Sequence, residues 1–220
     1  MPDDVDPLRA DWPGLPEPWP GLPDPASVAL VGNAPGTDAA AADAAARVVR
    51  FNNAPGFGGR TGSRVTHLVL VNRGGQMREW LADPGFLDRP VVRRAEAFVL
   101  PFPMLPEAHN RPEPICSTRE ALAMLRPLGR PVHVLPETLH DAARAALGRH
   151  GAGGVPNPST GFLAALAVLA GRPAGSPPVE AYGFGFAGWT GHPWAAERAW
   201  FAAAAASGRL RLHPPPPADG

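Results

Sequence analysis

Short runs rich in strand-forming residues alternate with alanine-rich stretches of helical character, and this alternation limits the possible folds more than any other feature. Strands are expected over residues 28–31, 47–52, 67–71, 97–100, 131–135, 179–184 and 209–213. Helices are expected over residues 37–46, 76–81, 117–125, 137–150, 159–170 and 194–207. This order predicts an α/β fold with a mostly parallel sheet and helices on both faces. Right-handed crossovers would then bring the carboxyl ends of the strands to one edge, where ligands bind.

The distribution of proline divides the chain into three parts. With 220 residues and 45% hydrophobic side chains, the chain can form one compact domain with a sizeable core. Glycine and proline make up one quarter of the residues, but proline concentrates at the two ends. We therefore expect a proline-rich arm at 1–25, one domain at 26–213 and a proline-rich tail at 214–220. Tryptophan and leucine recur within the arm, which either lies over the domain or docks on another protein.

The charged residues exclude several classes of protein. Lys+Arg 20 equals Asp+Glu 20, and the two signs are interspersed, which argues against a nucleic-acid or membrane-surface protein. All of the basic residues are arginine. The absence of lysine excludes a Walker phosphate loop, Schiff-base chemistry and attachment of pyridoxal phosphate, because each of these needs a lysine amine.

Cysteine content and the start of the chain bear on its location. A single cysteine, Cys116, excludes an internal disulfide and a cysteine-based zinc site, and it fits a small buried side chain. The acidic start lacks the apolar segment of a secretory signal, and no apolar run approaches the ~18 residues that cross a bilayer. These features predict a cytoplasmic protein without a transmembrane segment.

The first segment with chemical content is the turn after the first strand. A buried strand that ends at Gly32, turns tightly through Asn33 and opens a helix has the nucleotide-binding geometry of α/β sheets, although the full glycine fingerprint is absent. Asn52 follows Gly32 by 20 residues, the spacing at which dinucleotide-binding folds place an acid on the ribose. Its neutral amide can both donate and accept hydrogen bonds.

The second segment, PNPSTGF at 156–162, leads into an apolar helix. Ser159 or Thr160 at the N-cap, followed by Gly161, exposes backbone N–H groups at the positive end of the helix. A phosphate fits there without a lysine or a metal, and plain helix capping is the structural alternative.

The third segment runs from the strand end at Phe184 and Gly185 to a loop that presents His192 just before a helix. A histidine near the strand ends can remove a proton at neutral pH, and a structural role is the alternative. Glu197 either pairs with a group of this loop or is solvated. The other histidines show no metal-ligand spacing, so no metal site is expected.

Together, these segments resemble the sialylmotifs of the animal-type sialyltransferases, glycosyltransferase family 29. Residues 28–33, 48–52 and 59–67 are similar to the long motif, and residues 158–161 with 179–185 are similar to the short motif. His192 and Trp194 resemble the third motif, and His192 with Glu197 fits the H-x-x-x-x-E pattern of the very short motif. The stretch between 72 and 155 carries no signature of the family.

The resemblance implies a single Rossmann-like domain of the GT-A-variant, sialyltransferase-like type. It also implies an inverting, metal-independent transfer of sialic acid, or a related keto sugar, from a CMP-sugar donor to a hydroxyl of a glycan acceptor. In this interpretation His192 is the general base or a phosphate ligand, and Trp194 and Glu197 support it. The donor nucleotide would be bound by residues of all three segments: Gly32, Asn33, Asn52, Ser159, Thr160, Gly161, Phe184 and Gly185.

The positions of the family's disulfide hold Val28 and Ser176 here, which fits a bacterial-type member in a reducing compartment. The resemblance leaves two other functions open. One is a non-catalytic module of the same fold that binds CMP or another nucleotide without transfer. The other is a Rossmann-type oxidoreductase, which the missing glycine fingerprint and ribose acid disfavour.

Overall fold

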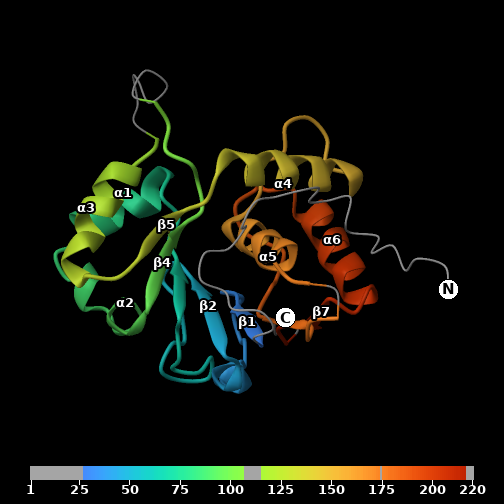
Figure 1. Ribbon diagram of the computed structural model, residues 1–220, viewed down its shortest axis with the longest axis horizontal. Coiled ribbons are helices and arrows are strands. Elements are labelled where there is room, and N and C mark those ends of the chain that lie inside the picture. Colours follow the sequence, from blue (N-terminus) through green and yellow to red (C-terminus); the bar gives the residue numbers. More distant parts are fainter. Residues whose placement is uncertain (1–26, 107–114, 174, 217–220) are drawn as a thin grey trace.

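The computed structural model describes residues 27–106, 115–173 and 175–216 (Figure 1). Within these residues the chain forms a seven-stranded sheet of order β5-β4-β3-β2-β1-β6-β7, in which every neighbouring pair is parallel. The strands are β1 Val28–Val31, β2 Arg47–Phe51, β3 His67–Val69, β4 Ala97–Leu100, β5 Val132–Val134, β6 Val179–Tyr182 and β7 Leu210–His213. The expected parallel α/β sheet is confirmed.

Helices cover both faces of this sheet (Figure 1). The α-helices are α1 Gly74–Ala82, α2 Pro90–Arg94, α3 Thr118–Leu125, α4 Glu137–Arg149, α5 Thr160–Ala170 and α6 Trp194–Ala206. The 3-10 helices are η2 Ala40–Ala44, η3 Phe86–Asp88 and η5 Arg126–Leu128. Side chains alternate along each strand, so that Leu68 and Phe98 pack against α1–α3, while Val69 and Val99 join the core with α4–α6.

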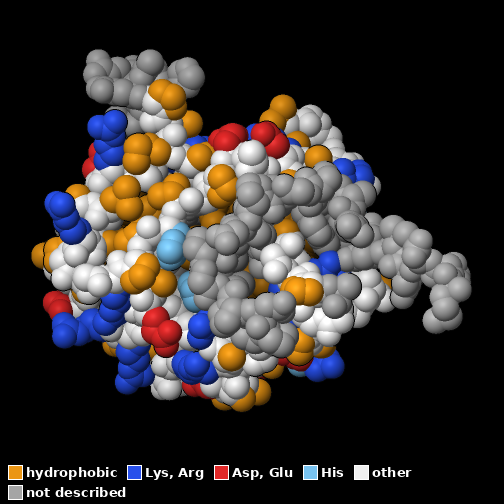
Figure 2. Space-filling model, in the orientation of Figure 1, with side chains coloured by type: hydrophobic (Ala, Val, Ile, Leu, Met, Phe, Trp, Pro, Cys, Tyr) orange, Lys and Arg blue, Asp and Glu red, His pale blue; other side chains and the backbone are white. Residues whose placement is uncertain are grey.

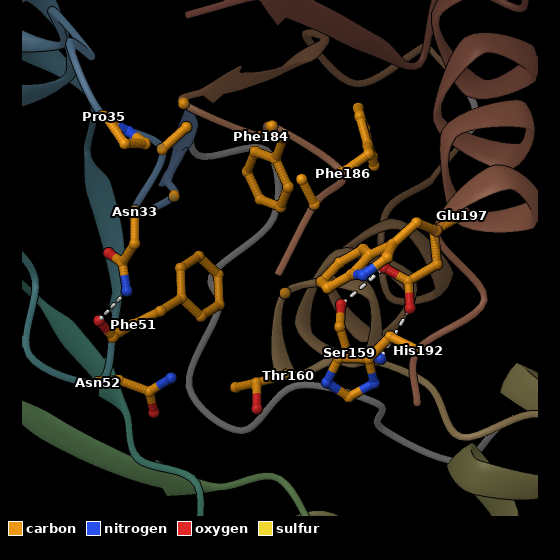
Figure 3. Close-up of a pocket in the computed structure, with 17 residues that line it drawn as sticks. Asn33, Pro35, Phe51, Asn52, Ser159, Thr160, Phe184, Phe186, His192 and Glu197 are labelled. Atoms are coloured by element: carbon orange, nitrogen blue, oxygen red, sulfur yellow. Dashed lines mark hydrogen bonds between the residues drawn. The ribbon is translucent and has the colours of Figure 1, made fainter. Parts of the chain in front are cut away.

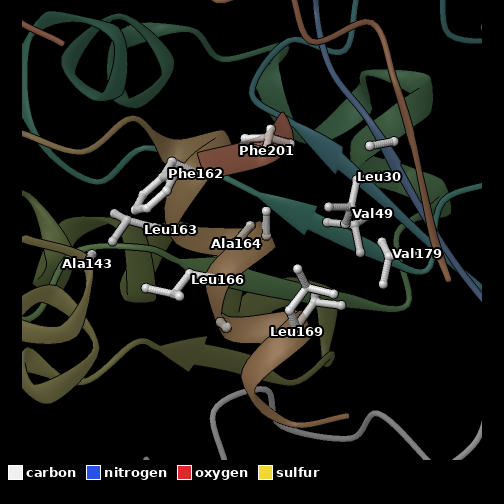
Figure 4. Packing of buried hydrophobic residues seen from close by; sticks show 14 of the residues in the cluster. Leu30, Val49, Ala143, Phe162, Leu163, Ala164, Leu166, Leu169, Val179 and Phe201 are labelled. Atoms are coloured by element: carbon white, nitrogen blue, oxygen red, sulfur yellow. The ribbon is translucent and has the colours of Figure 1, made fainter. Parts of the chain in front are cut away.

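The helix α5 lies at the centre of the larger core. Every residue from Phe162 to Leu169 is fully buried, because the sheet, α4 and α6 enclose the helix (Figure 4). A helix in this position must be apolar on all sides, which explains why it lacks the polar face of a surface helix. Leu30, Val49 and Val179 of the sheet lie against it. The packing fixes where the first turn of α5 sits relative to the strand ends.

The prediction of a helix at 37–46 is wrong, because this segment forms only the short 3-10 helix η2. The carboxylate of Asp43 accepts hydrogen bonds from the backbone amides of Ser63 (2.7 Å) and Arg64 (3.0 Å), and it pairs with the buried Arg50 at 3.5 Å. These contacts with the β2–β3 connection hold the segment in a compact turn. The alanine sequence favours an α-helix locally, but tertiary contacts decide the conformation.

The proline-rich arm expected at 1–25 lies outside the described residues, as does the end of the tail at 217–220. None of the helices in the described part of the chain combines the length and the apolar character that a membrane span needs. Basic and acidic side chains are both scattered over the face that Figure 2 shows, in line with the balanced charge of the sequence.

Candidate functional site

A cavity of about 310 Å³ lies at the carboxyl ends of β1 and β6, beside the first turns of α5 and α6 (Figure 3). The structure places every expected site residue in its wall: Gly32, Asn33, Asn52, Ser159, Thr160, Gly161, Phe184, Gly185, His192, Trp194 and Glu197. The three segments, which are far apart in the sequence, therefore meet at one site. Figure 3 shows Asn33 and Asn52 on one side of the cavity and His192 and Glu197 on the other.

Gly32 allows the ends of β1 and β6 to approach closely. Its amide donates to the carbonyl oxygen of Tyr182 (2.8 Å), and the amide of Ala34 donates to the carbonyl oxygen of Gly183 (3.1 Å). A Cβ atom at position 32 would lie 2.4 Å from the Gly183 carbonyl oxygen, which real structures do not allow. The glycine that the sequence pattern assigned to a nucleotide turn is thus required for the packing of two backbones.

Hydrogen bonds to the backbone fix both asparagine amides. The Asn33 Nδ2 group donates to the Phe51 carbonyl oxygen (3.0 Å), and the Asn52 Oδ1 atom accepts from the Val71 amide (3.0 Å). These partners define which amide atom is nitrogen and which is oxygen. Asn33 Oδ1 and Asn52 Nδ2 have no partner in the described part of the chain. The site therefore offers a ligand one acceptor and one two-hydrogen donor from this side.

Glu197 closes off part of the α5 N-terminus. Its carboxylate accepts from the Ser159 amide (2.8 Å) and from the Ser159 hydroxyl (2.7 Å), whose oxygen also caps the amide of Phe162 (3.1 Å). Burial raises the pKa of Glu197, although the Ser159 hydrogen bonds and the nearby His192 act against this shift. Ser159 is thus fully engaged. The amides of Thr160 and Gly161 meet no acceptor among the described residues, and they lie at the positive end of the helix.

His192 has a defined hydrogen-bonding arrangement. Its Nδ1 atom lies 2.9 Å from the carbonyl oxygen of Asn157. Because a carbonyl oxygen can only accept, Nδ1 carries the hydrogen, and Nε2 of the neutral ring is an unprotonated nitrogen. The rings of Trp189 and Trp194 stand edge-on to the imidazole, with centroid distances of 4.9 and 5.0 Å. This is the tautomer that a general base at Nε2 requires.

Aromatic residues that the sequence analysis missed form the apolar wall between these two sides. Phe51 and Phe186 line the cavity together with the expected Phe184, and the Phe51 and Phe184 rings meet edge-on at 6.0 Å. Phe186 has a φ of 49°, which is rare for a bulky side chain and often accompanies a functional site. Phe51 could have been found from its place beside Asn52 at a strand end. No sequence signal marks Phe186.

Charged side chains are scarce at this site. Of the residues that line the cavity, only Glu197 and His192 have ionisable side chains, and none is arginine or tyrosine. In the part of the chain that the structure describes, no three His, Cys, Asp or Glu side chains lie close enough to hold a metal ion.

Three solved structures with a similar fold are sialyltransferases. A mammalian sialyltransferase is 17% identical, with a TM-score of 0.54 over 94% of this chain and 76% of its own. The sialyltransferase CST-II in complex with CMP is 12% identical, with a TM-score of 0.54 over 87% of this chain and 82% of its own. An α-2,3-sialyltransferase from Campylobacter jejuni is 11% identical, with a TM-score of 0.56 over 90% and 78%. The chain therefore has the sialyltransferase type of glycosyltransferase fold.

Sequence comparison identifies the family more narrowly. The urease operon 23 kDa accessory protein of Rhizobium meliloti (strain 1021) is 30% identical over 201 residues, which cover 85% of this chain and 93% of the relative. The chain belongs to the family of this accessory protein. No family model matches the chain.

Proposed function

We propose that this cavity binds a CMP-activated keto sugar, such as CMP-sialic acid, and that the protein transfers the sugar to a hydroxyl of a glycan with inversion and without a metal. One observation carries the proposal. The Nε2 atom of His192, which carries no hydrogen when the ring is neutral, and the open amides of Thr160 and Gly161 belong to the same cavity.

The α5 N-terminus would hold the phosphate of the donor. Two backbone N–H groups and the helix dipole stabilise an anion there, and the Asn52 Nδ2 group can add a third donor from the opposite side. Ser159 orients this end of the helix through Glu197 instead of binding the phosphate itself. The presence of CMP in a solved structure of the same fold supports the binding of a cytidine nucleotide by this protein.

His192 would act on the acceptor. Its Nε2 atom takes the proton of the acceptor hydroxyl while the oxygen attacks the anomeric carbon from the face opposite the phosphate. The bond between this carbon and the phosphate oxygen breaks, and CMP leaves with the electron pair. Preorganised N–H donors stabilise the charge that develops on the phosphate, which is the role that a metal ion has in other transferases. The carbonyl oxygen of Asn157 keeps the imidazole oriented and stabilises it once it is protonated.

The direct test is the release of CMP from CMP-sialic acid and from CMP-Kdo in the presence of a panel of glycans. We expect His192→Ala to lower kcat by about 10²–10⁴-fold, the usual contribution of a general base. Gly153→Ala is the matched control, because a Cβ atom at that position would touch nothing within 4 Å. Unchanged turnover in the His192 variant would remove this residue from the mechanism.

The second candidate is a nucleotide-binding module without transfer, which the relationship to an accessory protein of a urease operon favours. Isothermal titration calorimetry distinguishes the two functions. Binding of CMP with no turnover on any donor and acceptor would support the module and contradict the transferase. Binding of NAD instead of CMP would contradict the transferase and favour the Rossmann-type oxidoreductase.

A further inference from the structure

The loop between β6 and α6 holds a tryptophan out toward solvent beside the cavity. Trp189 is 62% exposed, and no other aromatic side chain is as open among the described residues. An exposed indole presents a large apolar surface to water, and covering this surface with a ligand is favourable. Tryptophan is also the side chain most enriched at the centres of binding surfaces.

The loop is constructed around this side chain. A Cβ atom at Gly191 would lie 2.2–2.5 Å from three atoms of the Trp189 ring, so the indole keeps its position only because residue 191 is glycine. The Trp189 carbonyl oxygen accepts from the Trp194 indole (3.0 Å) and from the His192 amide (3.2 Å). Gly188 has a φ of 137°, a conformation that suits glycine alone. The exposed ring is therefore held in one place.

The Trp189 indole lies against the imidazole of His192. The Trp189 and His192 rings meet at a centroid distance of 4.9 Å and an interplanar angle of 84°. A sugar whose hydroxyl reaches Nε2 of His192 must place its ring within about one sugar diameter of the indole. The groups that the structure places against the indole, Gly191 and His192, carry no fixed charge. An uncharged partner with an apolar face fits this surface.

We propose that Trp189 is the platform for the acceptor, on which a neutral pyranose stacks the face that carries its C–H bonds. This inference rests on the proposed function, because it takes His192 as the base that defines where the acceptor hydroxyl lies. Stacking removes apolar surface of the sugar and the indole from water, and the hydroxyl groups at the sugar edge stay free to reach the imidazole. Trp189 thereby selects acceptors by the face they present.

Binding can be tested without turnover, with methyl β-D-galactopyranoside as the probe. In saturation-transfer NMR we expect the native protein to transfer magnetisation to the ring protons of the glycoside. We expect the effect to be lost in Trp189→Ala and in Gly191→Ala, which displaces the indole. Val155→Ala is the control, because it removes an 86% exposed apolar side chain outside the β6–α6 loop, and it should behave as the native protein does. Equal transfer in Trp189→Ala, or none in the native protein, would overturn the platform.

Kinetics separate this inference from the proposed function. We expect Trp189→Ala to raise the acceptor KM about tenfold, equivalent to about 1.4 kcal/mol, with the donor KM changed by less than about twofold. In the Trp189→Ala background, Gly191→Ala should have no further effect, because both act through the indole. Transfer that continues with an unchanged acceptor KM would overturn the platform and leave the transferase. Trp189-dependent binding of the glycoside without release of CMP would overturn the transferase and leave the platform as a glycan-binding site.

Discussion

A single carboxylate, that of Glu197, determines which polar groups of the cavity remain open to a ligand. It occupies both donors of Ser159, and it leaves the next two amides of α5 free. The sequence could identify Ser159 and Glu197 as members of the site, because both lie in segments with a recognisable pattern. It could not show that they bind each other across 38 residues, since no local spacing encodes a contact between two helices.

We expect Glu197→Gln to change how stability depends on pH. Burial raises the pKa of Glu197 above its ordinary value of 4.5. The folded state then holds this proton to higher pH than the unfolded state, so the contribution of Glu197 to stability falls as the pH rises from 4.5 through the raised pKa. Glutamine has no such contribution. Urea denaturation from about pH 4 to about pH 8 should therefore show the native chain losing free energy of unfolding relative to the variant as the pH rises.

An increase in the stability of the native chain relative to Glu197→Gln as the pH rises would contradict a raised pKa of Glu197. A native chain that gains stability relative to Glu197→Gln over this range would mean that the Ser159 hydrogen bonds outweigh burial, and that the pKa is lowered. The carboxylate would then be a permanent negative charge at the N-terminus of α5, which would oppose a phosphate there.

Among the secondary-structure elements, the sequence predicted β1 and β4 with their observed bounds, and it predicted α3–α6 to within one residue at each end. These elements have apolar patterns that agree with their tertiary environment. The expected strands that ended at 52 and 184 stop earlier, because the chain turns at Asn52 and Gly183 with positive φ values of 53° and 66°. The short helix α2 was missed, since its sequence PVVRR has the β-branched residues typical of strands.

The close approach of the ends of β1 and β6 at Gly32 can be tested by mutation. Gly32→Ala should destabilise the protein by about 1–3 kcal/mol, because the new methyl group forces two strand ends apart. The carbonyl oxygen of Gly183 is the obstacle, and backbone atoms cannot yield as a flexible side chain can. Urea denaturation measures the loss, with Gly153→Ala expected to stay within about 0.5 kcal/mol of the native chain. Equal stability of the two variants would show that the junction is looser than the structure indicates.

For the molecule as a whole, the cavity joins two parts of the chain that are distant in sequence. Asn33 and Asn52 come from the first third of the domain, and the α5 and α6 termini come from the last third. The alternation of strands and helices was sufficient to predict that these parts would meet at one edge of the sheet. The stretch between 72 and 155 could not be interpreted in the same way, because it supplies β4, β5 and the helices α1–α4 and no residue of the cavity.

A ligand that bridges the two parts should stabilise the entire domain. At a free CMP concentration of about 100 times Kd, binding adds about 2.7 kcal/mol to the free energy of unfolding. For a chain of this length, this corresponds to a rise in Tm of about 5–10 °C. Differential scanning calorimetry with CMP, and with NAD as the control nucleotide, measures the shift. A Tm that does not respond to saturating CMP would contradict a cytidylate site.

The enclosure of α5 has a consequence for hydrogen exchange. Its residues from Phe162 to Leu169 are buried on every side, so this part of the helix cannot open by itself, and its amides become accessible to solvent only when the main core unfolds. The first turn of α5 is anchored to this slowly exchanging segment. The β6–α6 loop, which lines the cavity next to this turn, has no such enclosure and can fluctuate on a much shorter timescale. The α5 part of the cavity wall thus persists as long as the native state does, while the loop can adapt to different ligands.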